Sequence, residues 1–283
     1  MPEYNEILEN TTLADKVNRY RVYAPEIVKR RQAGQFVIIR IDEDGERVPL
    51  TIADTDPDSG ALVLVVQAVG KSTAHMAQLE PGFVLADVVG PLGSPTHIEK
   101  VGTVVMVGGG IGIAPAHPIA QAMKAAGNRV VSILGARSKD LLIMEAELTA
   151  ASDEVLICTD DGSYGRHGLV TDVLEDLIAD QGKPDLVVAI GPPIMMKFVS
   201  LLTKEHEIPT VASVNPIMID GTGMCGGCRI TVGGKTRFGC VDGPEFDAHQ
   251  IDFDEMMQRQ AFYKEQEKLA LERYEHKCKL GSK

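Results

Sequence analysis

Residues 103–115 read Thr-Val-Val-Met-Val-Gly-Gly-Gly-Ile-Gly-Ile-Ala-Pro, an apolar β-strand pattern followed by a glycine turn and a helix start. The free N–H groups and positive dipole end of a helix N-terminus favour anions, and glycines allow a pyrophosphate to approach them. Pro115 replaces the third glycine of the usual G-x-G-x-x-G pattern, so this is not the plain dinucleotide fingerprint. The residues predicted to contact a nucleotide here are Gly109, Gly110, Ile111 and Gly112.

Strand and helix patterns alternate from this first strand onward. They cover residues 103–107, 115–126, 129–134, 141–150, 155–159, 169–180 and 186–190. Such alternation predicts a parallel sheet with crossover helices. Three strand ends carry turns at the edge where open parallel sheets bind ligands, although loops are rich in the same residue types. The predicted site residues in these turns are Gly135, Arg137, Asp161, Gly162, Gly191 and Pro192.

The N-terminal part of the chain has a different pattern, with short β-branched or aliphatic runs broken by Gly, Pro and Asp. These runs are residues 35–41, 48–53, 61–69 and 84–89, and they predict an antiparallel barrel or sandwich. Arg47, Pro49 and Thr51 share one face of an extended strand. Arg47 is placed to pair with a flavin pyrophosphate and Thr51 to reach the isoalloxazine edge, unless Arg47 is simply a solvated edge residue. The other candidate flavin or phosphate contacts are Leu50, Gly70, Lys71, Ser72 and Thr73.

A cysteine-rich segment follows the parallel-sheet pattern. It reads Asp220-Gly-Thr-Gly-Met-Cys225-Gly-Gly-Cys228, with Cys240 eleven residues further on. The offsets match the plant-type [2Fe–2S] spacing C-x4-C-x2-C…C, with aspartate in the position of the first cysteine. The predicted ligands are therefore Asp220, Cys225, Cys228 and Cys240.

Two alternatives remain open for this segment. A structural zinc site could use the same cysteines, but the nearest histidine, His249, lies outside the tight segment. Asp220 could instead cap the following turn through its backbone N–H groups. Cys158 and Cys278 lie far from the segment in sequence, so we expect them to be structural or incidental.

Composition excludes several classes of protein. The chain has 283 residues, enough for about two domains. Its net charge of −12 has the wrong sign for binding nucleic acid. An odd number of cysteines and an acidic N-terminus argue against a disulfide framework and a secretory signal, so we expect a cytoplasmic protein. Residues 102–123 lack formal charge, but their glycine turn argues against a membrane span, and no membrane association is expected.

The residues after Asp252 are good helix formers as far as Leu280, and their apolar positions recur only loosely at helical spacing. We expect a helix that docks on a partner subunit or back across the chain's own domains. Deleting residues 255–283 is then expected to leave flavin content intact and to impair assembly.

The order of these motifs resembles that of the ferredoxin-reductase-like superfamily. The motifs are Arg47–Thr51, Gly70–Thr73, Gly90–Gly93, Gly108–Pro115, Gly191–Pro193 and the cysteine segment. More narrowly, the chain resembles the electron-transfer subunits of dihydroorotate dehydrogenase B and their sulfide-dehydrogenase relatives. It is most similar to the small subunits of NADH-dependent ferredoxin:NADP oxidoreductases, which also have aspartate at the first cluster position.

The resemblance implies a multi-domain chain. Its parts would be an FAD-binding β-barrel over residues 1–98, an NAD(P)-binding α/β domain over 99–214, a [2Fe–2S] segment over 215–248 and a helical extension over 249–283. It also implies electron transfer among NAD(H), FAD and the cluster, in a heterodimer with a larger flavin and iron–sulfur subunit that would in turn meet ferredoxin. Hydride transfer occurs at the flavin, so no catalytic side chain is expected.

Two other functions compete with this one: a self-sufficient NAD(P)H-dependent reductase with a diffusible acceptor, and a non-catalytic, zinc-stabilised module. The choice of nucleotide is also divided. Arg137, Ser138 and Lys139 are groups able to hold a 2′-phosphate, which favours NADP. The resemblance implies NADH instead, and NADH is the prediction that we adopt.

Overall fold

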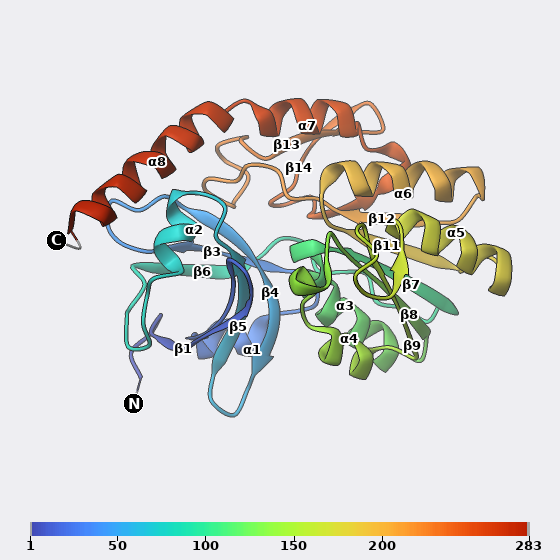
Figure 1. The fold of residues 1–283 in the computed structure, drawn as a ribbon, viewed down its shortest axis with the longest axis horizontal. Helices are drawn as coiled ribbons and strands as arrows, with labels where there is room; N and C mark the ends of the chain where they lie inside the picture. The colour runs from blue at the N-terminus through green and yellow to red at the C-terminus, as the bar shows by residue number, and fades with distance from the viewer. Residues whose placement is uncertain (1, 282–283) are drawn as a thin grey trace.

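The N-terminal part of the chain forms an antiparallel barrel, as predicted. The computed structural model describes residues 2–281, with side chains described as far as residue 276, so the side chain of Cys278 lies outside the described residues. Six strands are hydrogen-bonded in the order β1-β2-β5-β4-β3-β6 (Figure 1). They are β1 (Ile7–Ala14), β2 (Val17–Tyr23), β3 (Phe36–Arg40), β4 (Val48–Asp56), β5 (Ala61–Gln67) and β6 (Asp87–Leu92). Two short helices, α1 (Pro25–Arg30) and α2 (Lys71–Met76), accompany the sheet.

The barrel closes through residues that were predicted to form a strand of their own. The sequence predicts a strand over residues 84–89, whereas β6 begins at Asp87. Residues before it pair instead with the free edge of β1: the Ile7 N–H donates to the Phe83 carbonyl at 2.8 Å, and an isolated bridge joins Glu6 to Val84. Closure removes the unpaired edges of the sheet. Strands β1 and β2 were not predicted individually, because polar residues interrupt their apolar positions.

The central part of the chain forms a second sheet of seven strands in the order β10-β9-β8-β7-β11-β12-β15. The strands are β7 (Thr103–Gly109), β8 (Arg129–Ala136), β9 (Glu154–Thr159), β10 (Arg166–His167), β11 (Leu186–Ile190), β12 (Thr210–Ser213) and β15 (Glu245–Asp247). All neighbours are parallel except β12 and β15. This confirms the predicted parallel sheet, to which the cysteine segment adds one antiparallel edge strand.

Helices cover both faces of this sheet. The α-helices are α3 (Ile113–Ala125), α4 (Glu145–Ala151), α5 (Val170–Gln181) and α6 (Pro193–Glu205), and the 3-10 turns are η1 (Gly110–Gly112), η2 (Lys139–Leu141) and η3 (Ala248–Gln250). Helix α6 was not predicted, because Gly191-Pro-Pro indicates a turn. The second proline, Pro193, in fact occupies the first helical position, where a missing N–H costs nothing.

The barrel and the parallel sheet each have a core of their own and are joined by a third apolar cluster. Val17, Ala53 and Val65 of the barrel belong to the same buried cluster as residues of α3 and β7. The buried His117 side chain of α3 also makes a 3.1 Å hydrogen bond from Nδ1 to the Ala53 carbonyl. These contacts hold the barrel and the parallel sheet in one arrangement.

The C-terminal extension forms two helices rather than the single predicted one. Helix α7 (Phe253–Ala261) has Phe262 as its C-cap, and α8 (Lys264–Gly281) follows. Helix α7 lies above the hairpin of β13 (Arg229–Val232) and β14 (Lys235–Phe238), and α8 continues from there over the barrel to α2 (Figure 1). There the Tyr274 hydroxyl donates to Gln78 Oε1 at 3.0 Å. The extension therefore lies back across the chain's own domains.

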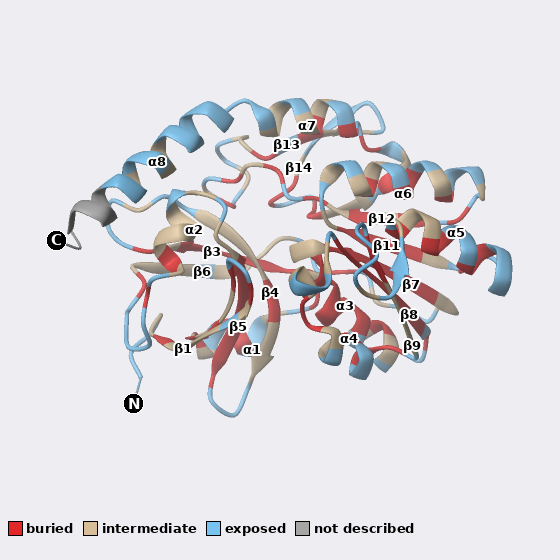
Figure 2. Cartoon of the chain, viewed as in Figure 1, coloured by how far each residue is buried: buried red, intermediate tan, exposed pale blue. Residues whose placement is uncertain are grey.

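Burial differs sharply between these two helices. Phe253 and Met256 of α7 are buried in the core of the parallel-sheet domain. The described side chains of α8 are mostly exposed (Figure 2). None of the helices that the structure describes combines the length and the hydropathy needed to span a bilayer.

A carboxyl group joins the edge strand β15 to the linker between the two sheets. The Thr96 hydroxyl donates to Glu245 Oε1 at 2.6 Å. Burial raises the pKa of Glu245 to about 7, an effect that the Thr96 hydrogen bond opposes. The folded chain therefore favours the protonated form of Glu245 more strongly than the unfolded chain does.

This raised pKa predicts a specific dependence of stability on pH. The stabilisation from protonated Glu245 is complete below its ordinary pKa of 4.5 and is lost as the pH rises to about 7, at a cost of roughly 2–3 kcal/mol. Glu245→Gln keeps an acceptor for Thr96 but cannot ionise. Thermal melts should show the variant gaining stability over the wild type between about pH 5 and pH 8. Parallel melting curves across that range would contradict the assignment.

Candidate cofactor cavity and metal centre

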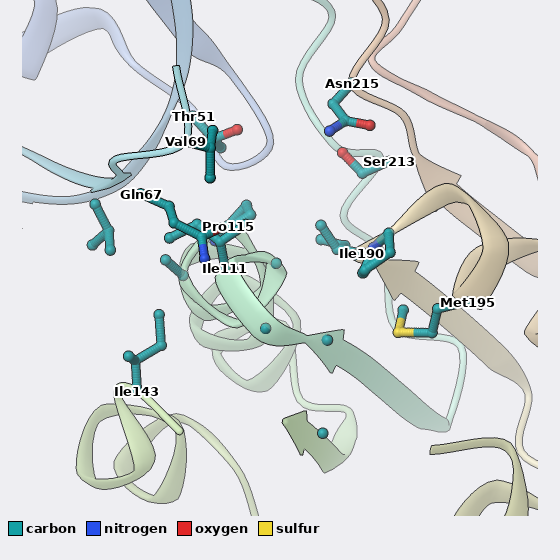
Figure 3. Close-up of a pocket in the computed structure, with 18 of the residues that line it drawn as sticks. Thr51, Gln67, Val69, Ile111, Pro115, Ile143, Ile190, Met195, Ser213 and Asn215 are labelled. Carbon is teal, nitrogen blue, oxygen red and sulfur yellow. The ribbon is translucent and has the colours of Figure 1, made fainter. Parts of the chain in front are cut away.

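One large cavity, of about 860 Å³, lies where the barrel, the parallel sheet and the cysteine segment meet (Figure 3). In Figure 3, Thr51, Gln67 and Val69 lie on one side of it, and Ile190, Met195, Ser213 and Asn215 lie opposite. Its size falls in the range of small-molecule and cofactor sites. The predicted residues that line it are Pro49, Leu50, Thr51, Thr73, Gly109, Gly110, Ile111, Gly112, Gly135, Arg137, Gly191 and Pro192.

The glycine turn contributes the floor of the cavity. Strands β8 and β11 lie on either side of β7, so the chain changes direction across the sheet at the end of β7, where open α/β sheets bind ligands. A Cβ atom on Gly112 would lie 2.3 Å from the Ile190 carbonyl oxygen, so only glycine permits this approach of the turn η1 to the end of β11. Helix α3 directly continues η1 and has no side-chain cap, so no capping side chain competes with an anion at this turn.

The barrel contributes apolar walls and a few polar groups. Thr51 is paired with Phe36 across β4 and β3, and both line the cavity. Apolar walls suit the flat rings of a flavin, and a small number of hydroxyl and amide groups can orient them. The residues present therefore fit a flavin on this side of the cavity.

Several predicted contacts lie elsewhere. Arg47 is exposed just before β4 and is not among the lining residues. Lys71 and Ser72 line a separate pocket of about 480 Å³, where the Ser72 hydroxyl donates to Glu46 Oε2 at 2.5 Å. Gly70 precedes α2 and lies outside both pockets. Only Thr73 of this motif lines the large cavity.

The turn after β9 also differs from the prediction. Asp160 lines the cavity, whereas Asp161 and Gly162 do not. Asp161 Oδ1 instead accepts hydrogen bonds from the Ser163 N–H at 2.9 Å and the Ser163 hydroxyl at 2.6 Å, which lower the pKa of Asp161. The carboxylate is therefore used to form its own turn.

Sequence reasoning missed part of the lining. The missed residues include Gln67, Val69, Ile143, Ile194, Met195, Phe198, Ser213, Asn215 and Met218. Ser213 ends β12 and Asn215 follows it. This strand of four residues is too short to stand out in the sequence, although a strand end in that position would have indicated both residues. The apolar residues carry no local signal that separates a cavity wall from a core.

Two of the three thiols in the cysteine segment, those of Cys228 and Cys240, are buried side by side, and the third, that of Cys225, is exposed. The sulfur atoms of Cys228 and Cys240 lie 3.2 Å apart, and the Cys240 N–H points at Cys228 Sγ at 3.4 Å. Burial, followed by the neighbouring Cys228 thiol, raises the pKa of Cys240 to about 12. The Gly227 N–H points at Cys225 Sγ, also at 3.4 Å. Backbone N–H groups directed at sulfur are the surroundings that an iron–sulfur cluster requires.

Asp220 lies beside Cys225. Its Oδ1 accepts from the Thr222 N–H at 2.5 Å and from the Thr222 hydroxyl at 2.6 Å, and its Oδ2 accepts from the Cys225 N–H at 2.8 Å. These bonds, with those from Thr222 foremost, hold the pKa of Asp220 far below its usual range. The carboxylate is thus an anion that caps the turn in this structure, as in the alternative interpretation.

The four predicted ligands are connected in twos: the Asp220 carboxylate accepts the Cys225 backbone N–H, and the Cys228 and Cys240 thiols lie side by side. The negative charge of Asp220 contributes to the raised pKa of Cys240, so the pairs are neighbours. Among the side chains that the structure describes, no three histidine, cysteine, aspartate or glutamate residues are grouped closely enough to hold one metal ion. Two pairs suit a cluster with two iron atoms better than a single tetrahedral zinc ion.

The cysteine segment packs directly on the barrel. Gly221 lies against Ile38 of β3 and Leu92 of β6, and its φ of 77° is a backbone conformation that favours glycine. Phe36 and Met218 belong to the apolar cluster that contains Cys228 and Cys240, and both also line the large cavity. Phe36 and Met218 therefore join the cavity wall to the apolar cluster around the buried thiols.

Two family models match the chain. One is the oxidoreductase NAD-binding domain, over residues 106–201, and the other is the iron–sulfur cluster binding domain of dihydroorotate dehydrogenase B, over residues 215–252. The second match favours iron–sulfur over zinc in the cysteine segment.

Individual proteins are similar over nearly the whole chain. The dihydroorotate dehydrogenase B (NAD(+)) electron transfer subunit homolog of Thermotoga maritima is 50% identical over 270 residues, which are 95% of each chain. A chain of the NADH-dependent reduced ferredoxin-NADP oxidoreductase, studied for flavin-based electron bifurcation, superposes with a TM-score of 0.92 at 47% identity, covering 97% of this chain and 99% of that one. Phthalate dioxygenase reductase shares the fold alone, with a TM-score of 0.59 at 16% identity over 80% of this chain and 85% of that one.

Proposed function

Because this chain belongs to the family of dihydroorotate dehydrogenase B electron transfer subunits, we propose that it passes electrons between NAD(H), FAD and a [2Fe–2S] cluster as one subunit of an oxidoreductase. The observation that carries the proposal is the shared wall formed by Phe36 and Met218 between the large cavity and the buried thiols. This wall brings a flavin site and a cluster site together in one chain.

The two sides of the cavity have different tasks in this proposal. Pro49, Leu50 and Thr51 on the barrel side hold the flavin ring, while Gly110 and Gly112 bind the nucleotide pyrophosphate at the N-terminus of α3. FAD, when bound, supplies hydride and single-electron chemistry. The chain's own residues bind, orient and exclude water. Arg47, exposed just before β4, would pair with the phosphate groups of the flavin cofactor.

Asp220, Cys225, Cys228 and Cys240 hold the cluster in this proposal. Their arrangement in two pairs supports a binuclear site, and the iron–sulfur family match supports it independently. The zinc-stabilised module is correspondingly disfavoured. The four described cysteines are free thiols, which is consistent with the reducing cytoplasm, where we place the protein.

A larger flavin and iron–sulfur subunit is the proposed partner, with ferredoxin reached through it. Three large apolar side chains on or next to the cysteine segment are exposed: Met224 by 89%, Ile219 by 54% and Val241 by 43%. Exposed apolar groups gathered around a redox centre suit a docking surface. This observation favours a heterodimer over a self-sufficient reductase that serves a diffusible acceptor.

The absorption spectrum of the purified chain tests this proposal. Flavin bands together with broad cluster absorption are expected, and anaerobic NADH should bleach both. Metal analysis should find two iron atoms for each flavin, as a [2Fe–2S] cluster requires. A colourless protein that contains zinc would refute the proposal.

The preferred nucleotide is predicted to be NADH. Of the groups able to hold a 2′-phosphate, Lys139 is turned toward Tyr164, with Nζ 5.0 Å from the ring centroid. Arg137 alone is then left in the cavity wall to recognise that phosphate. Stopped-flow reduction of the bound flavin should give a kcat/KM at least about tenfold higher for NADH than for NADPH, a difference of 1.4 kcal/mol. A higher value for NADPH would reverse the assignment.

A further inference from the structure

Helix α7 is anchored firmly on the parallel-sheet domain. Phe253 and Met256 are buried in its core, and Lys197 Nζ of α6 lies 2.7 Å and 2.9 Å from the two carboxylate oxygens of Asp254. The helix is therefore a rigid support for whatever its last turn contacts.

That last turn contacts the cysteine segment at two points. The Gln260 side-chain amide donates to the Asn215 carbonyl at 2.9 Å, and Asn215 also lines the cofactor cavity. The half-buried Arg259 guanidinium donates to the Gly227 carbonyl at 3.4 Å. Gly227 lies between Cys225 and Cys228, so α7 reaches into the turn that presents both thiols.

A second guanidinium holds the preceding carbonyl of the same turn. Arg229 donates to the Gly226 carbonyl at 3.0 Å. That carbonyl belongs to the peptide whose N–H, on Gly227, points at Cys225 Sγ. A cationic donor on a carbonyl polarises its peptide and strengthens the hydrogen bond from the N–H on the other side. Arg259 acts in the same way on the next peptide, which leads into Cys228.

We propose that Arg259 is a positioning residue for the cluster: from the C-terminal extension, it fixes the two-cysteine turn and raises the reduction potential of the cluster. This inference rests on the proposed function, since it requires a [2Fe–2S] cluster on Cys225 and Cys228. Reduction adds negative charge, which a nearby guanidinium favours. Hydrogen bonding around the sulfur atoms also sets the potential of such clusters.

The test compares Arg259→Gln with Arg273→Gln in the full-length chain purified with its cofactors. Arg273 is exposed on α8, so its substitution removes the same charge from the same extension. A redox titration followed by EPR should move the cluster potential of Arg259→Gln to a more negative value, with FAD content and flavin potential unchanged. Arg273→Gln should match the wild type. Arg259→Lys should give an intermediate potential, because it keeps the charge but loses the planar fork.

Each outcome bears on the inference. Unchanged cluster potential and g-values in Arg259→Gln would overturn it. Loss of the cluster from Arg259→Gln with FAD retained, and its recovery in Arg259→Lys, would support it. Equal loss of FAD and cluster in both Arg259 variants would indicate a general folding defect and reject a specific role. A wild-type chain without a cluster signal would instead overturn the proposed function itself, and this inference with it.

Discussion

Replacing Asp220 with alanine is expected to remove most of the [2Fe–2S] cluster from the purified chain while FAD remains bound. The substitution deletes the carboxylate that occupies the first ligand position, five residues before Cys225. FAD should remain because its predicted contacts lie on β4 of the barrel. Asp220 does not line the cofactor cavity. Iron content, flavin content and EPR of the same preparation measure both effects. Asp220→Cys should keep the cluster with a shifted potential, because thiolate and carboxylate differ as ligands.

Asp220 also caps its turn, so a second variant must separate capping from ligation. Asparagine has one acceptor oxygen, which can keep the Thr222 hydrogen bonds, but its NH2 group cannot accept the Cys225 N–H, and it is a neutral and much weaker ligand. Asp220→Asn should therefore keep the Thr222 side of the turn and still lose cluster. Asp242→Ala is a matched control, since Asp242 accepts the Phe238 N–H at 2.7 Å in the same segment but lies outside the ligand spacing. A full cluster with unchanged g-values and potential in Asp220→Asn would show that Asp220 is only a cap.

Removing α7 is expected to unfold the parallel-sheet domain, whereas removing α8 alone should not. Met256 is 1% exposed and Phe253 is 5% exposed, both within the core of that domain. Truncation of one such side chain to alanine costs about 2–5 kcal/mol, a large share of a domain's stability. Deleting residues 253–283 should therefore yield insoluble or molten protein. Deleting residues 264–283 should leave the melting temperature and both cofactors intact and weaken assembly with the larger subunit.

The structure places the start of the dispensable C-terminal region later in the chain than sequence reasoning alone did. Deletion from residue 255 looked harmless to the flavin domain, but it would remove Met256 from the core. Met256→Ala against Leu269→Ala provides the point-mutant comparison, because Leu269 on α8 is 52% exposed. Denaturant titration should show a loss of about 2–5 kcal/mol for Met256→Ala and a much smaller one for Leu269→Ala. Equal losses would place α8 in the core as firmly as α7.

Local patterns were sufficient for the main features of the fold and for the candidate metal ligands. The glycine turn before α3 can be predicted from a few adjacent residues, because strand, turn and helix start follow directly along the chain. The offsets from Asp220 to Cys228 likewise depend only on the reach of a short loop. Chain length was enough to predict at least two cores.

Contacts between distant segments were decided by the tertiary structure alone. The cavity wall shared by Phe36 and Met218 joins residues 182 positions apart in the sequence, and the core role of Met256 depends on helices packed around it. Polar contacts between distant segments could not be predicted from the sequence either. Arg259 contacts Gly227, and Thr96 contacts Glu245, only where these segments pack together in the folded chain. Residue type and spacing determine what a short segment can do. Which groups meet across segments is determined by packing, because burial and hydrogen bonding depend on every surface that comes together.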